Sequence, residues 1–163
     1  MKKVYILSKR EFDSLMTKKG LNVDNVVDKV PMTAFISICS EVDQENFLDQ
    51  RPHFTKDTDN VLNLLFEDIT EDVMTKTMGK DVLMKAFTKD QGKKIVEFLE
   101  KHKDKESLIV HCAAGISRSG AVGTFAAEYY DLNYSDFKKD NPHIHPNSLV
   151  ITTLRRLVNG YED

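Results

Sequence analysis

Cysteine is scarce in this sequence. Only two of the 163 residues are cysteines, Cys39 and Cys112, and they do not form a C-x-x-C pair. This pattern supports neither a disulfide framework nor a zinc site. Cys39 ends an apolar run, so we interpret it as a buried strand residue; a resolving thiol that protects Cys112 during oxidation is the alternative.

Long apolar runs and an excess of positive charge are also missing. No run approaches the roughly 20 residues that span a bilayer, and the apolar part of Met1–Ser8 is too short for a signal peptide. The 23 basic and 26 acidic residues give a formal net charge of −3, so no basic field attracts nucleic acid or an anionic membrane. We expect a cytoplasmic protein with no nucleic-acid and no membrane partner.

Internal repeats, low-complexity tracts and linker-like runs are absent as well. The composition, 40% hydrophobic and 30% charged, is that of an ordinary globular protein. A chain of this length can bury a sizeable core, so we predict a single domain over residues 1–163.

A strand, a loop and a helix are predicted in succession from Ser107 onward. The short β-branched run Ser107–Val110 is typical of a buried strand. The small apolar residues of Ala121–Ala127 suit a helix packed closely on a sheet. The loop between them points backbone N–H groups at one spot, and the helix dipole adds positive charge there, so the sequence predicts an anion site.

Cys112 lies at this anion site. The N–H groups and the Arg118 cation favour its thiolate, which makes it a candidate nucleophile at neutral pH. The Arg118 guanidinium can bind two phosphate oxygens at once. Gly115 can take a positive φ that lets the loop curl around a ligand. We expect the Ser119 hydroxyl to hydrogen-bond the sulfur and His111 to order the loop backbone.

The ten residues His111–Gly120, HCAAGISRSG, resemble the H-C-x-x-G-x-x-R-[ST]-G signature of the cysteine-dependent protein tyrosine phosphatases, in particular the small dual-specificity-like bacterial members. The resemblance implies a catalytic set of Cys112, Arg118, Ser119 and His111. It also implies a phosphate-binding loop (P-loop) whose N–H groups come from Ala113, Ala114, Gly115, Ile116, Ser117 and Arg118. Motif matches depend on context, and the predicted strand, loop and helix are the context that this motif requires.

A proton donor for the leaving oxygen is expected at the end of another strand. The run Asn60–Phe66 predicts a strand that ends in acidic residues, and the carboxyl ends of parallel strands share one edge with Cys112. Phe66–Ile69 resembles the F-x-D-I of small bacterial relatives, which makes Asp68 our candidate general acid. The stretch from Asp68 to Cys112 is longer than the family commonly shows, and Asp72 and Asp81 are the alternatives.

The remaining regular elements predict the fold class. Val4–Leu7 and Thr33–Cys39 are predicted strands, Arg10–Lys18 is a predicted helix, and a second amphipathic helix starts at Thr88 or Asp90 and runs to Lys101. We expect an α/β fold with a central, mostly parallel sheet of about four to five strands flanked by helices, as in the phosphatases that the signature resembles.

Two polar segments interrupt this pattern. Residues 40–59 are predicted to be mostly loop, with a short helix over Glu45–Asp49 and an exposed histidine at His53. The segment Glu71–Asp90 accounts for the extra length before the signature, and it is interpreted either as a mobile lid or as a passive insertion.

The C-terminal part begins with Tyr134–Asp140, which is interpreted as a polar turn. His143 and His145 form a His-x-His pair that no carboxylate or cysteine completes, so we predict no metal there. Ile144–Asn147 matches the I-x-P-N that opens the last helix in dual-specificity-like phosphatases. The predicted buried residues of that helix are Leu149, Val150, Leu154 and Leu157.

The function predicted from these observations is phosphomonoester hydrolysis through a phosphocysteine, without metal or organic cofactor. The uncharged loop residues Ala113, Ala114, Ile116 and Ser117 favour a protein phosphotyrosine, or another singly phosphorylated group, over a polyanion. The substrate is then a phosphotyrosine-containing protein, with dual specificity left open, or a small phosphomonoester. The alternatives are a catalytically weak phosphotyrosine-binding module and a rhodanese-like sulfurtransferase.

Overall fold

The structure is a computed structural model that describes residues 1–41, 51–77 and 79–160. The helix predicted over Glu45–Asp49 lies outside the described residues. The elements follow in the order β1 (Lys3–Ser8), α1 (Lys9–Lys18), α2 (Val26–Lys29), β2 (Thr33–Cys39), β3 (Val61–Leu65), β4 (Val73–Thr77), β5 (Lys80–Met84), α3 (Lys89–Lys101), β6 (Ser107–Cys112), α4 (Arg118–Tyr129), α5 (Tyr134–Asp140) and α6 (Ser148–Asn159).

Four parallel strands in the order β1-β6-β2-β3 form the central sheet. Strand β6 lies between β1 and β2, with Cys112 beside Ser8 and with His111 beside Leu7 on one side and Ser37 on the other. Cys112 therefore ends an interior strand at the carboxyl edge of the sheet, where ligands of open α/β sheets bind. The predicted α/β class is confirmed.

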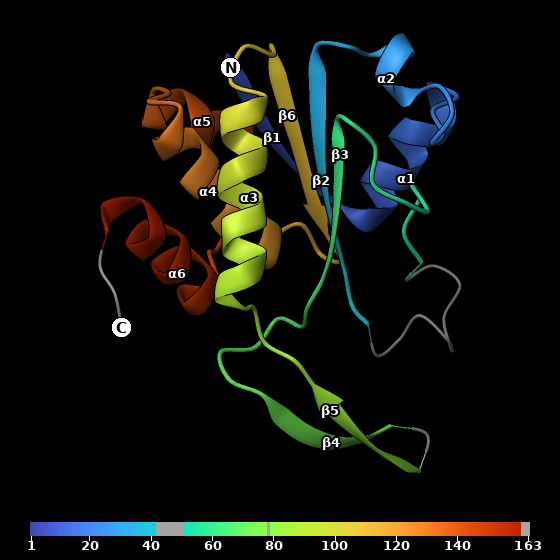
Figure 1. Ribbon diagram of the computed structural model, residues 1–163, viewed down its shortest axis with the longest axis vertical. Coiled ribbons are helices and arrows are strands. Elements are labelled where there is room, and N and C mark those ends of the chain that lie inside the picture. Colours follow the sequence, from blue (N-terminus) through green and yellow to red (C-terminus); the bar gives the residue numbers. More distant parts are fainter. Residues whose placement is uncertain (42–50, 78, 161–163) are drawn as a thin grey trace.

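Helices cover both faces of this sheet (Figure 1). On one face α1 and α2 pack over a cluster that contains Phe12, Met16, Phe35 and Phe54. On the other face α3, α4 and α6 enclose the larger core, whose sheet residues include Ile36 and Val110, among others. Adjacent strand residues such as Phe35 and Ile36 point to opposite faces and are both buried, so β2 is apolar on both faces apart from the buried Ser37.

Capping residues explain where the predicted helices begin. Ser8 and Glu11 form a capping box at α1, and Thr88 and Gln91 form one at α3. Asn147 caps α6 by accepting a hydrogen bond from the Val150 amide, so the predicted start of the last helix is confirmed. The predicted strands β1, β2, β3 and β6 are all present, with bounds that differ by a residue or two at most ends.

The interpretation of Tyr134–Asp140 as a polar turn is wrong. The segment is the short helix α5, whose N-terminus is capped by the Asn133 side chain accepting from the Asp136 amide. Phe137 is the buried residue that ties this helix to the core.

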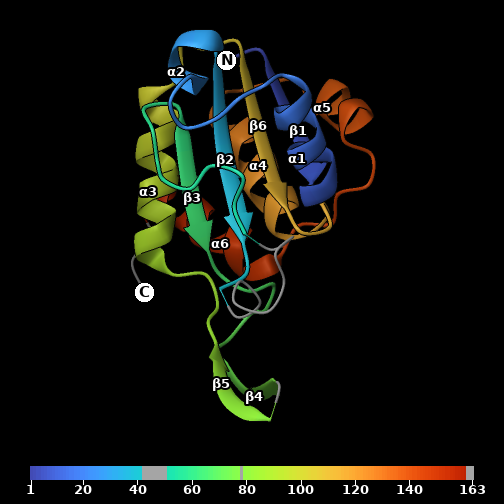
Figure 2. The same cartoon turned by 90° about the vertical axis from the view of Figure 1, so that its right-hand side faces the viewer.

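Strands β4 and β5, within the long segment before α3, pair antiparallel as a hairpin. Figures 1 and 2 show that this hairpin extends from the carboxyl edge of the main sheet and stands apart from the body. Two hydrogen bonds close its base, from the Glu67 amide to the Lys85 carbonyl at 2.9 Å and from the Ala86 amide to Asp72 Oδ1 at 2.8 Å. In the described ranges, no helix is both long and apolar enough to cross a bilayer.

Candidate active site

The loop between β6 and α4 is folded tightly against the start of α1. Gly115 has a φ of +72°, and a Cβ at this position would lie 2.6 Å from the Ser8 amide nitrogen and 2.7 Å from the Leu7 carbonyl carbon. The Lys9 amide donates to the Ala113 carbonyl at 3.1 Å. Only glycine fits this backbone and this contact, so the predicted left-handed glycine in the loop is confirmed.

Cys112 is buried at the base of the loop, with 2% of its surface exposed. Its Sγ lies 3.0 Å from Ser119 Oγ and accepts a hydrogen bond from the Gly115 amide at 3.3 Å. Burial raises the pKa of the thiol, but the hydrogen bonds from Ser119, the Arg118 charge and the Gly115 N–H outweigh it, so the pKa lies below its ordinary value. The predicted hydrogen bond between Ser119 and the sulfur is present.

Arg118 is also buried, and it is the first residue of α4. Its Nη1 donates to the Phe66 carbonyl at 2.8 Å and to Ser40 Oγ at 3.0 Å, which fixes the plane of the guanidinium. Its Nε is buried and has no hydrogen-bond partner among the described residues. Buried donors are normally paired, so this one fits an anion held in the loop.

His111 is fully buried beneath the loop and stacks on Phe12, with ring centroids 4.1 Å apart. Its Nδ1 lies 3.2 Å from the Cys112 carbonyl and its Nε2 lies 2.6 Å from Ser37 Oγ. A carbonyl only accepts, so Nδ1 carries the proton and Nε2 accepts from the Ser37 hydroxyl. Burial lowers the pKa of His111 to about 4. The histidine is neutral at pH 7, and it orders the loop backbone as the sequence predicts.

Asp68 contacts the loop directly. Its Oδ1 accepts from Ser117 Oγ at 2.7 Å and from Asn147 Nδ2 at 2.9 Å. The backbone N–H of Asn147 in turn donates to the Ser117 carbonyl at 3.0 Å. Both bonds to the carboxylate use Oδ1, so Oδ2 is the oxygen left to carry a proton. The predicted meeting of this acid and the signature loop at one sheet edge is confirmed.

The two alternative acids have other surroundings. Asp72 accepts from the Ala86 amide and closes the base of the hairpin. Asp81 is exposed on β5, paired in register with Lys76. Of the three candidates, only Asp68 is hydrogen-bonded to a residue of the 113–117 loop by the bonds among the described residues.

Three residues that position the site were not predicted as part of it. Ser37, Ser40 and Asn147 anchor His111, Arg118 and Asp68 respectively. Asn147 carried a sequence signal, the I-x-P-N motif, but only as a helix start. The serines carry none, because only the fold brings their partners, His111 on β6 and Arg118 on α4, beside them.

The interpretation of His53 as an exposed loop histidine is wrong. The ring is partly buried between Phe12 and Phe54, and its Nε2 lies 2.7 Å from the Leu21 carbonyl. It supports the packing of α1. Cys39 is buried as predicted, with 3% of its surface exposed, and burial raises the pKa of its thiol.

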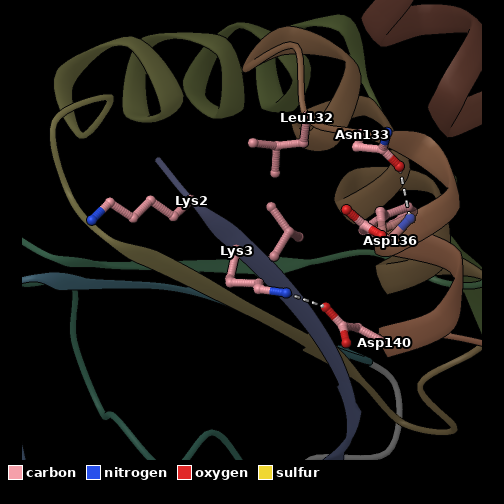
Figure 3. A pocket seen from close by; sticks show the side chains of 8 residues that line it. Lys2, Lys3, Leu132, Asn133, Asp136 and Asp140 are labelled. Carbon is pink, nitrogen blue, oxygen red and sulfur yellow. Dashed lines mark hydrogen bonds and ion pairs between the residues drawn. The ribbon is translucent and has the colours of Figure 1, made fainter.

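Two other places were considered for ligands. His143 and His145 are exposed, and the described residues hold no group of three or more side chains that could bind a metal ion. A hollow of about 140 Å³ is lined by Lys3, Asp136 and Asp140, among others (Figure 3). Lys3 pairs in register with Ser107 at the amino end of β6, so this hollow lies at the end of the sheet opposite Cys112.

Comparison with known proteins gives structural matches only. No protein-family model and no curated sequence matches the chain. The human tyrosine phosphatase-like serine/threonine/tyrosine-interacting protein is 21% identical, with a TM-score of 0.52 over 83% of this chain and 82% of its own. Tk-PTP in the active form is 16% identical, with a TM-score of 0.50 over 99% and 95%. PTPMT1 in complex with PI(5)P is 16% identical, with a TM-score of 0.50 over 97% and 91%.

These matches cover 83%, 99% and 97% of this chain, and they share a phosphatase-like architecture. The chain therefore has the fold of the cysteine-dependent tyrosine phosphatases, and the predicted fold resemblance is confirmed. At these identities the likeness concerns the fold, and the chemistry is argued from the site itself.

Proposed function

We propose that this protein hydrolyses phosphomonoesters through a phosphocysteine intermediate on Cys112. The observation that carries the proposal is the set of contacts around the Cys112 sulfur. Its Sγ lies 3.0 Å from Ser119 Oγ and accepts from the Gly115 amide at 3.3 Å, beside the buried Arg118 Nε that has no partner among the described residues. These donors and the Arg118 charge lower the pKa of the thiol in spite of burial. At Cys39, by contrast, burial outweighs a hydrogen bond from Ser37 and the charges of Lys9 and Arg118, so the pKa of that thiol is raised.

In the first step the Cys112 thiolate attacks phosphorus, so that an S–P bond forms and the P–O bond to the leaving group breaks. The loop N–H groups of Ala113 to Arg118 and the Arg118 guanidinium hold the three other phosphate oxygens, which bear the charge in the transition state. Asp68 gives the proton on Oδ2 to the leaving oxygen, a role worth roughly 10²–10⁴ in rate.

In the second step water attacks the phosphocysteine and the S–P bond breaks. Asp68, now a carboxylate, takes the proton of the attacking water, and inorganic phosphate leaves. Ser119 donates a hydrogen bond from its hydroxyl to the departing thiolate and keeps its proton, which makes the sulfur a better leaving group. These steps use side chains and backbone groups of this chain alone.

The proposed substrate is a protein phosphotyrosine. In the broader form of the proposal, the enzyme has dual specificity and also hydrolyses phosphoserine and phosphothreonine. Two observations support it. The variable loop residues carry no charge, which suits a single phosphate, and Ile116, 41% exposed, offers an apolar contact beside the loop for an aromatic leaving group. A phosphoinositide, which PTPMT1 holds in its complex, is the competing monoester.

The test is hydrolysis of an activated aryl phosphate and a phosphotyrosine peptide by wild type, Cys112→Ser and Arg118→Lys, with EDTA present throughout. We expect turnover of both substrates by wild type and none by either variant. Turnover that persists in Cys112→Ser refutes the phosphocysteine. Tight phosphopeptide binding without turnover by wild type would make the protein a phosphotyrosine reader.

A further inference from the structure

Asn147 connects three segments around the candidate active site. Its carboxamide Nδ2 donates to Asp68 Oδ1 at 2.9 Å and to the Ile69 carbonyl at 3.3 Å. Its Oδ1 accepts from the backbone N–H of Val150, in the first turn of α6, at 3.1 Å. Its own backbone N–H donates to the Ser117 carbonyl of the signature loop at 3.0 Å. One residue, 7% exposed, thus joins the candidate acid, the loop and the last helix.

The partners of the Asn147 carboxamide fix the direction in which it faces. A backbone N–H only donates, so the atom that faces Val150 is the oxygen and the atom that faces Asp68 is the nitrogen. If the carboxamide turned over, its buried NH₂ group would face the Val150 N–H, and neither donor would have a partner. The carboxamide therefore always presents a donor to Asp68.

The contacts of Asp68 show what this donor does. The aspartate is exposed, so without partners its carboxyl group would sample several rotamers. Ser117 Oγ, at 2.7 Å, and Asn147 Nδ2, at 2.9 Å, both bind Oδ1, which leaves Oδ2 for the proton. Because the backbone N–H of Asn147 also binds the Ser117 carbonyl, the three residues form a closed triangle of hydrogen bonds. This triangle fixes the acid relative to the signature loop.

Resting on the proposed function, we propose that Asn147 is a positioning residue for proton transfer. Its carboxamide holds Asp68 so that the proton on Oδ2 passes to the leaving oxygen as the S–P bond forms and the P–O bond breaks; Asn147 itself exchanges no proton. This placement matters for a poor leaving group such as the tyrosine phenol, whose pKa is about 10. It matters little for an activated aryl phosphate, whose leaving anion is stable without a proton. Ser117 also binds Asp68, but it belongs to the phosphate-binding loop, so Asn147 is the residue that separates acid placement from phosphate binding.

The competing role of Asn147 is the cap of α6, and one substitution separates the two roles. Serine is as good an N-cap as asparagine, so Asn147→Ser keeps an acceptor for α6, but its shorter side chain cannot also donate to Asp68. The matched control is Asn133→Ser. Asn133 caps α5 by accepting from the Asp136 N–H at 3.0 Å, and it lines the hollow at the end of the sheet opposite Cys112.

The test compares kcat/KM, which reports formation of the phosphocysteine, because the second step is the same for every substrate. We expect Asn147→Ser to lose about 10- to 100-fold on a phosphotyrosine peptide and to keep the wild-type value on an activated aryl phosphate. Asn133→Ser should match wild type on both substrates. An equal loss on both would show that Asn147 acts only through the packing of α6, and it would overturn the inference.

A double-mutant cycle with Asp68→Asn gives an independent readout. If Asn147 acts through Asp68, adding Asn147→Ser to Asp68→Asn should cause no further loss on the peptide. Losses that multiply would mean that Asn147 acts elsewhere, which overturns the inference. Aryl phosphate turnover by wild type, with a peptide rate that does not depend on Asn147, refutes this inference alone. Absence of aryl phosphate turnover by wild type refutes the proposed function, and this inference with it.

Discussion

Removing the Ser119 hydroxyl tests what ionises Cys112. In Ser119→Ala the sulfur loses the donor at 3.0 Å, while the Gly115 amide and Arg118 remain. Ser119 is fully buried and alanine is slightly smaller, so the loop has no cause to rearrange. A hydrogen bond to a charged group contributes about 1.5–3 kcal/mol. Because about 1.4 kcal/mol corresponds to tenfold, the thiolate fraction at a fixed pH below the pKa should fall roughly 10- to 100-fold.

The assay is the pH dependence of iodoacetamide alkylation in a Cys39→Ser background, which leaves one thiol to report. Ser119→Ala should move the alkylation profile to higher pH and move the acidic limb of kcat/KM for an aryl phosphate with it. Alanine at the exposed Ser135 is the control and should leave both profiles in place. An unchanged alkylation profile in Ser119→Ala would show that the loop amides and Arg118 ionise the sulfur without the hydroxyl.

Three further predictions concern other parts of the site. Asp68→Asn should lose about 10²–10⁴ in rate on a phosphotyrosine peptide and much less on an activated aryl phosphate, whereas Asp72→Asn should keep both rates. Gly115→Ala should lower the free energy of unfolding, measured by urea titration, by at least the roughly 1–3 kcal/mol of a strained φ, because the new Cβ meets the β1 backbone. The pKa of His111 is about 4 when folded against an ordinary 6.5, so protonation favours the unfolded chain. Stability is therefore lost as pH falls from about 6.5 to 4, by about 3 kcal/mol, and urea unfolding of His111→Gln should lack that loss.

The parts of the fold that the sequence predicts are those whose signals are local. Strand β2 has the predicted bounds because Thr33–Cys39 is a mostly apolar, β-branched run, interrupted within the strand only by Ser37. The loop at Gly115 and the start of α6 at Asn147 follow from single residues that select a backbone conformation. The helix α5 has a signal of the same kind at Asn133, but its exposed polar residues concealed it.

The contacts that complete the site depend on tertiary packing. Arg118 is held by Ser40 and by the Phe66 carbonyl, which follow two different strands. Nothing in the sequence around His53 predicts that its ring contacts Phe12 of α1. Such contacts arise because parallel strands that are far apart in the sequence end at the same edge of the sheet. The sequence pattern predicts which residues lie at that edge, but it does not predict which of them contact one another.

The long stretch of sequence between Asp68 and Cys112 is the feature that kept Asp72 and Asp81 as alternatives to Asp68. The β4–β5 hairpin explains why the length of this stretch does not separate Asp68 from the loop. The stretch from Asp68 to Cys112 is long because β4 and β5 lie within it, yet the Glu67 amide reaches the Lys85 carbonyl at 2.9 Å. The chain therefore leaves the body and returns to the point where it left, so the insertion adds length without moving its ends. A hairpin whose two strands pair with each other satisfies its own backbone hydrogen bonds, so it can lengthen the segment between Asp68 and Cys112 without shifting Asp68. The extra residues were an argument against Asp68 only as long as they were assumed to displace it.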